Sequence, residues 1–191
     1  DYNACSYAKV DYSHFMNITA KVALRMIPDS LATQPIFLCV DDTMVAKAGT
    51  RFENVSKLFD HAAHNGSNYL NGHCFVSIML CIPVWKNDRV SYLSLPLGYR
   101  MWQKKESKLE LAASMIRQVM PEFQEKKQVI ILCDSWYTKR NLVSIVDEYL
   151  NLDLIGNARI DSVMYDPVPA HTGHRGRPAK HGKRLSVETD F

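Results

Sequence analysis

Two short apolar runs that each end in aspartate constrain the fold of this chain more than any other feature. One run covers residues 36–40 and is followed by Asp41 and Asp42; the other covers residues 129–133 and is followed by Asp134. A short apolar run bounded by polar residues is typical of a buried strand. If the two strands pair in parallel, their ends lie at one edge of a sheet, about 4.8 Å apart. The sequence therefore predicts an α/β domain with carboxylates at one strand edge.

The rest of the pattern predicts a mixed sheet flanked by helices. Apolar residues recur at helical spacing in three segments, residues 5–27, 106–125 and 139–150. Five segments have the composition of strands, residues 36–41, 74–82, 90–97, 128–133 and 152–158. The polar residues 49–72 are expected to form loop and turn. Short links favour an antiparallel meander of the first three strands, and the helix crossover then returns the fourth strand parallel to an earlier one.

The strand-end aspartates are the candidate chemistry. A carboxylate at the end of a buried strand is costly unless it is hydrogen-bonded, paired or metal-bound. Mg²⁺ prefers one or two carboxylates completed by waters and substrate phosphates. Two such ions can activate a water or a 3′-hydroxyl and stabilise the leaving oxygen. The alternative is that these aspartates only cap the next turn or helix. Strand alternation turns just one of Asp41 and Asp42 toward a metal.

Positive charge is concentrated in one segment. The net charge is +3, yet residues 171–184 contain five basic residues and no acid. These residues are Arg175, Arg177, Lys180, Lys183 and Arg184. Their Arg-Gly-Arg-Pro sequence suits neither a helix nor a central strand. An extended basic strip fits nucleic-acid phosphates, the alternative being a solvated linker. Trp136 and Tyr137 could likewise stack on a splayed base or pack over the edge of the sheet.

The cysteines and the hydropathy bear on the compartment. Four of the five cysteines lie in strand-like runs and none forms a Cys-x-x-Cys pair, which favours core thiols in a reducing cytoplasm. No apolar stretch approaches the roughly 20 residues that a membrane span needs. We therefore expect a cytoplasmic protein without a membrane partner.

Three motifs together resemble bacterial insertion-sequence transposases of the DDE superfamily. Residues 41–49, Asp-Asp-Thr-Met-Val-Ala-Lys-Ala-Gly, are similar to the D-D-T-x-x-x-K-x-G signature. Residues 133–137, Cys-Asp-Ser-Trp-Tyr, look like a strand that ends in D-x-x-Y or D-x-x-F. Residues 176–182 resemble the basic G-R-P-x-K-x-G segment. The motifs occur in the family's order and the resemblance covers about residues 30–190.

The resemblance implies an RNase H-like catalytic core of the DDE type. Such enzymes bind two Mg²⁺ or Mn²⁺ ions with three acids, nick DNA at transposon ends and join a 3′-hydroxyl to target DNA. Carried over, Asp134 is the second acid. Asp41 is the favoured first acid, because the family's aspartate usually precedes one residue and then Thr; Asp42 is the alternative.

The same resemblance implies the partners and the location. The partners are transposon-end and target DNA, bound by a homodimer, and the location is the bacterial cytoplasm in association with the nucleoid. A non-catalytic DNA-binding module that uses the Arg-Gly-Arg-Pro arm is one alternative function. Another RNase H-like nuclease is the second.

The third acid departs from the pattern. It is a glutamate that the family carries on a helix after an inserted subdomain. Glu188 follows Arg184 at the spacing of the family's Y-x-x-R-x-x-x-E motif, but His181 replaces the tyrosine. We therefore expect the glutamate beyond residue 191 and expect this polypeptide alone to be a poor catalyst. The expected organisation is an N-terminal helical segment at 1–28, a partial catalytic core at 29–160, and the basic start of an insertion or linker at 161–191.

Overall fold

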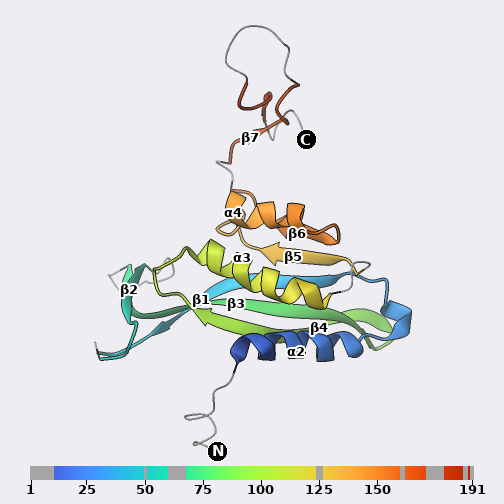
Figure 1. Cartoon of the computed structure of the whole chain (residues 1–191), viewed down its shortest axis with the longest axis horizontal. Coiled ribbons are helices and arrows are strands. Elements are labelled where there is room, and N and C mark those ends of the chain that lie inside the picture. The colour runs from blue at the N-terminus through green and yellow to red at the C-terminus, as the bar shows by residue number, and fades with distance from the viewer. Residues whose placement is uncertain are drawn as a thin grey trace, which may run out of the picture. The chain divides into compact units, whose positions relative to one another are not determined.

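The computed structural model describes residues 11–49, 51–59, 68–123, 127–159, 162–170, 179–186 and 189. The chain divides into two units, Asp1–Asn157 and Ala158–Phe191. The described elements of the first unit are, in chain order, α2 (Tyr12–Arg25), η1 (Asp29–Leu31), β1 (Ile36–Ala46), β2 (Ser56–Phe59), β3 (Tyr69–Lys86), β4 (Arg89–Met101), α3 (Lys108–Val119), η2 (Met120–Glu122), β5 (Val129–Cys133), α4 (Arg140–Val143), η3 (Ser144–Glu148) and β6 (Leu152–Gly156) (Figure 1).

The sheet of the first unit is mixed, as expected. Its strand order is β2-β3-β1-β5-β6, and β4 also pairs with β3. Strands β1, β3 and β4 form the antiparallel meander, whereas β5 pairs parallel to β1 and β6 parallel to β5. This is the arrangement predicted for an RNase H-like core. Because Val40 is the register partner of Cys133, β1 and β5 run toward the same edge of the sheet.

The core lies on one face of the sheet. Along β1, Ile36, Leu38 and Val40 are buried, whereas Phe37 and Cys39 between them are partly exposed. The buried side chains belong to one hydrophobic cluster with residues of α2, α3, α4 and η3. The helices therefore cover the face to which the even-numbered residues of β1 point.

No helix in the described part of the chain is long and apolar enough to cross a membrane.

The region predicted to be loop at residues 49–72 contains a strand, so that prediction was wrong. Strand β2 pairs with the first residues of β3, and β3 begins at Tyr69 rather than at residue 74. Gly72 pairs with both Ala46 and Ser56. A Cβ at Gly72 would collide with the carbonyl oxygen of Val45, so glycine here marks a close backbone approach inside a sheet rather than a loop.

Two predicted helices are shorter than their apolar patterns suggested. The segment expected at 106–125 is α-helical only to Val119 and continues as η2, because Pro121 lacks an amide donor. The segment expected at 139–150 splits into α4 and η3. Its β-branched residues, Val143, Ile145 and Val146, disfavour a longer helix.

The second unit contains a short ladder where no regular structure was expected. Strands β7 (Met164–Tyr165) and β8 (Arg184–Leu185) pair antiparallel. The Asp166 amide donates to the Lys183 carbonyl at 2.9 Å, and the rings of Tyr165 and His181 stack with centroids 4.7 Å apart. The basic segment is therefore partly anchored by backbone pairing.

Candidate active site

A cavity of about 460 Å³ lies at the carboxyl end of β5 and beside the second half of β1, which continues past Asp42 to Ala46. The prediction that the first pair of aspartates marks the end of its strand was therefore wrong, whereas Asp134 does follow the last residue of β5. Two carboxylates line it, Asp42 and Asp134. Three lysines also line it, Lys57, Lys104 and Lys108, as do the aromatic residues Phe59, Tyr69, Trp102 and Trp136. Carboxylates, cations and flat rings thus converge from strands, loops and the start of α3.

Strand alternation decides which of the two neighbouring aspartates of β1 enters this cavity. Asp42 continues the buried face of Leu38 and Val40, and its register partner is the buried Val76. Asp41 lies on the other face, where it is exposed. The Asp42 amide donates to the Asp41 Oδ1 at 2.8 Å. Asp41 is not among the residues that line the cavity.

Three donors converge on the Asp42 carboxylate, whose side chain is only 16% exposed. The Lys108 Nζ donates to Oδ2 at 2.6 Å, and the Cys74 thiol donates to the same oxygen at 3.3 Å. The Tyr137 hydroxyl donates to Oδ1 at 3.1 Å. A poorly hydrated carboxylate needs such partners, so Asp42 is held as a charged group in a fixed orientation.

The Asp134 carboxylate is fixed by its own turn. Its Oδ1 accepts from the backbone amides of Trp136 at 3.0 Å and Tyr137 at 3.2 Å. Within the described part of the chain no donor contacts its Oδ2. Tyr137 therefore contacts both acids, Asp134 through its amide and Asp42 through its hydroxyl, and links the end of β5 to β1.

Electrostatics keep these donors protonated. Burial raises the pKa of the Tyr137 hydroxyl and the negative charge of Asp42 raises it further. Burial likewise raises the pKa of Cys74, to about 11. For Lys108, burial lowers the pKa, but the hydrogen bond and the charge of Asp42 outweigh that effect, so that its pKa is raised. At neutral pH all three groups donate to Asp42.

The position of Lys108 is set by a capping box. The Glu110 amide donates to the Ser107 hydroxyl at 3.1 Å, and the Ser107 amide donates to the Glu110 carboxylate at 2.8 Å. This reciprocal pair fixes the first turn of α3. Lys108, the first residue of the helix, thereby projects toward β1.

The predicted DNA-contacting residues lie in the second unit. Lys180, Lys183 and Arg184 are exposed, as a phosphate-binding role requires. Arg175 and Arg177 lie outside the described residues, as does Glu188, the alternative third acid. The two aromatic residues expected either to stack on a base or to pack over the sheet have different environments. Tyr137 is fully buried, as packing predicts, whereas Trp136 is 37% exposed and lines the cavity.

The donor set fits a hard divalent cation in its chemistry. Asp42 and Asp134 offer carboxylate oxygens, the ligands that Mg²⁺ prefers, and both face one cavity. Among the described residues, no group of three or more His, Cys, Asp and Glu is placed to hold a metal ion. Two protein carboxylates, with waters or phosphates, would therefore form the described part of such a site.

Sequence reasoning missed Lys108, Cys74 and Trp102 as members of the site. Lys108 lies 66 residues from Asp42 in the chain, and nothing local distinguishes it from a solvated lysine. Cys74 could have been found, since the antiparallel register of β1 and β3 places it on the same face as Asp42. Trp102 follows the end of β4, a strand predicted to be shorter.

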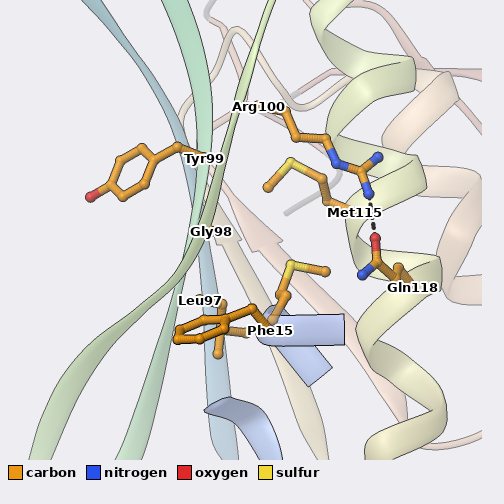
Figure 2. A pocket seen from close by; sticks show the side chains of 8 residues that line it. Phe15, Leu97, Gly98, Tyr99, Arg100, Met115 and Gln118 are labelled. Carbon is orange, nitrogen blue, oxygen red and sulfur yellow. Dashed lines mark hydrogen bonds between the residues drawn. The ribbon is translucent and has the colours of Figure 1, made fainter. Parts of the chain in front are cut away.

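A second cavity, of about 330 Å³, lies between α2, β4 and α3 and has different chemistry (Figure 2). Arg100 points to α3, where it donates to Ser114 at 3.0 Å and to Gln118. Tyr99 points to the opposite side of β4. None of the eight described residues that line this cavity carries a carboxylate, so the acids mark the first cavity as the candidate active site.

Comparison with known proteins gives one family and two solved structures. The family described as DDE superfamily endonuclease matches residues 5–190. The crystal structure of the Mos1 strand transfer complex is 14% identical, with a TM-score of 0.32, over 77% of this chain and 40% of that one. The Mos1 transposase paired-end complex with left transposon end is 11% identical, with a TM-score of 0.34, over 82% and 49%. The chain thus spans half or less of those chains. No curated protein matches the sequence.

Proposed function

This chain belongs to the DDE superfamily endonuclease family, and on that premise we propose that it carries catalytic residues of a metal-dependent DNA transposase. The reaction is cleavage at transposon ends followed by transfer of the cut strand to target DNA. The observation that carries the proposal is that Asp42, within β1, and Asp134, directly after the parallel strand β5, line one cavity. Two carboxylates that face one cavity can serve as ligands of the divalent ions that support phosphoryl transfer.

Asp42 and Asp134 would hold the metal. DDE superfamily endonucleases generally depend on divalent metal ions, and we infer two Mg²⁺ or Mn²⁺ ions here. Bound ions would polarise the phosphate and activate the attacking water or 3′-hydroxyl. Of the two candidates for the first acid, the geometry favours Asp42, because its carboxylate faces the cavity and that of Asp41 lies on the opposite face of β1.

Residues around the two acids orient them and would bind DNA. Tyr137 holds both acids through its amide and its hydroxyl. Lys57 and Lys104 are exposed and carry positive charge at the same cavity, which suits the DNA backbone. The half-exposed ring of Trp136 offers a surface on which a base can stack.

DNA is the proposed partner of both units. In the second unit, Lys180, Lys183 and Arg184 are exposed and would contact phosphates. The two similar solved structures are the Mos1 strand transfer complex and the Mos1 transposase paired-end complex with left transposon end. By analogy we propose transposon-end and target DNA as the substrates and a pair of protein chains as the assembly on DNA.

Strand-cleavage assays with the complete gene product test this proposal. Asp42→Asn and Asp134→Asn should each lower the Mg²⁺-dependent cleavage rate by at least about 100-fold, because each removes a metal ligand. Asp41→Asn is the matched control, since it makes the same charge change one residue away; its rate should stay within about threefold of wild type. Thermal unfolding verifies that each variant folds. Full cleavage by Asp134→Asn would reject the proposal.

A further inference from the structure

Lys108 occupies a position that is unfavourable for a cation. It is the first residue of α3, directly after the N-cap Ser107, where the partial positive charge of the helix end repels an ammonium group. Its side chain is only 18% exposed, so it has also lost much of its hydration. A lysine that bears both costs needs a compensating anion. Asp42, at 2.6 Å, is that anion.

The ammonium group occupies one of the two carboxylate oxygens that Asp42 could offer to a metal ion. Oδ2 of Asp42 accepts from Lys108 and Cys74, and Oδ1 accepts from Tyr137. A carboxylate in a Mg²⁺ site binds the ion directly through an oxygen. An ion on Oδ2 would lie next to the ammonium group, and two positive charges so close repel strongly in a partly buried site. An ion that binds Oδ2 would therefore compete with Lys108 for that oxygen.

The same cavity offers the ammonium group of Lys108 a second position, beside two tryptophan rings. Its Nζ lies 5.5 Å from the ring centroid of Trp102 and 5.3 Å from that of Trp136, and both rings line the cavity. Aromatic faces attract cations, and the lysine stem is flexible. The ammonium group can thus leave Asp42 without leaving the cavity.

We propose that Lys108 is an internal counter-ion that occupies the metal position at Asp42, and that a divalent ion displaces it toward Trp102 and Trp136. This inference rests on the proposed function, because it takes Asp42 to be a metal ligand. It makes Lys108 a positioning residue whose charge is exchanged for that of the ion.

Mn²⁺ titration of the 191-residue chain, with free ion counted by electron paramagnetic resonance, tests the proposal. Lys108→Met should lower the Kd for Mn²⁺ by about tenfold, because the competitor is gone. Lys108→Arg keeps the charge and should bind within about twofold of wild type. Lys104→Met is the matched control: Lys104 lines the same cavity but donates to the Lys57 carbonyl at 3.2 Å. Its loss should change the Kd by less than about twofold.

Amine acetylation of the wild-type chain, read residue by residue by mass spectrometry, gives a second measurement that needs no variant to fold. Saturating Mn²⁺ should increase the reactivity of Lys108 several-fold and leave that of Lys104 unchanged. Unchanged protection of Lys108 in saturating Mn²⁺ would overturn the displacement.

The role of Lys108 and the metal site at Asp42 can be refuted separately. The role of Lys108 would be overturned if Lys108→Met and Lys104→Met lowered the Kd for Mn²⁺ equally, or if neither lowered it. Loss of Mn²⁺ binding in Asp42→Asn would in that case leave the metal site standing. Equal Mn²⁺ binding by wild type and Asp42→Asn would overturn the metal site, and the inference with it.

Discussion

The two faces of β1 differ in burial and in the contacts that their side chains make, although their residues alternate along one strand. The even-numbered face packs Ile36, Leu38 and Val40 under the helices and carries Asp42 next along the strand. The odd-numbered face carries the partly exposed Phe37 and Cys39, followed by the exposed Asp41. Adjacent aspartates therefore have opposite environments. A carboxylate becomes a candidate ligand here because the strand beneath it belongs to the core, which fixes its direction and limits its hydration.

The contacts on the odd-numbered face of β1 are between thiols and between aromatic rings. Cys39 lies 3.7 Å from Cys81, sulfur to sulfur, and burial followed by the influence of Cys81 raises the pKa of Cys39 to about 11. The ring of Phe37 meets that of Tyr92 edge to face at 4.9 Å. These contacts lie at a partly hydrated surface and hold no charged group in place.

The sharpest stability contrast between the faces is expected from truncation of neighbouring residues. Leu38→Ala should lower the free energy of unfolding by about 2–5 kcal/mol, since it empties a fully buried position. Cys39→Ala, one residue on, should cost less than about 1 kcal/mol because its side chain is already partly exposed. Urea unfolding measures both. Equal losses would mean that the odd-numbered face is also core.

A smaller contrast is expected between two tyrosine hydroxyls. Tyr137→Phe removes a hydrogen bond to the charged Asp42 and should cost about 1.5–3 kcal/mol. Tyr92→Phe removes only a 3.4 Å contact with the Pro35 carbonyl on the other face, and its effect should stay within about 0.5 kcal/mol. The same unfolding experiment applies. A silent Tyr137→Phe would show that the link between the acids contributes nothing to stability.

The sequence predicted the strand edge because its signal is local. Each of the apolar runs that became β1 and β5 has a clear composition, and the crossover rule placed them in parallel. The choice between Asp41 and Asp42 depends on which face the helices cover, and that is decided by packing of α2 and α3 rather than by any residue near the pair. The family pattern pointed to Asp41, and the cavity contains Asp42.

The rest of the site could not be predicted because its contacts are distant in the chain. Lys108 reaches Asp42 from another element across 66 residues. Tyr137 became a link because the turn after Asp134 directs its ring inward, beneath the more exposed Trp136. Strand β2 was missed because its four residues, in a polar segment rich in glycine and asparagine, are stabilised by pairing with β3 rather than by their own propensity.

A crystal structure of the chain grown with Mn²⁺, with the ion located by its anomalous scattering, tests the central claim most directly. The account predicts manganese in the cavity with oxygen ligands from both Asp42 and Asp134, and the ammonium group of Lys108 moved off Oδ2. Manganese bound by Asp41 on the opposite face, or no manganese at either Asp42 or Asp134, would contradict it.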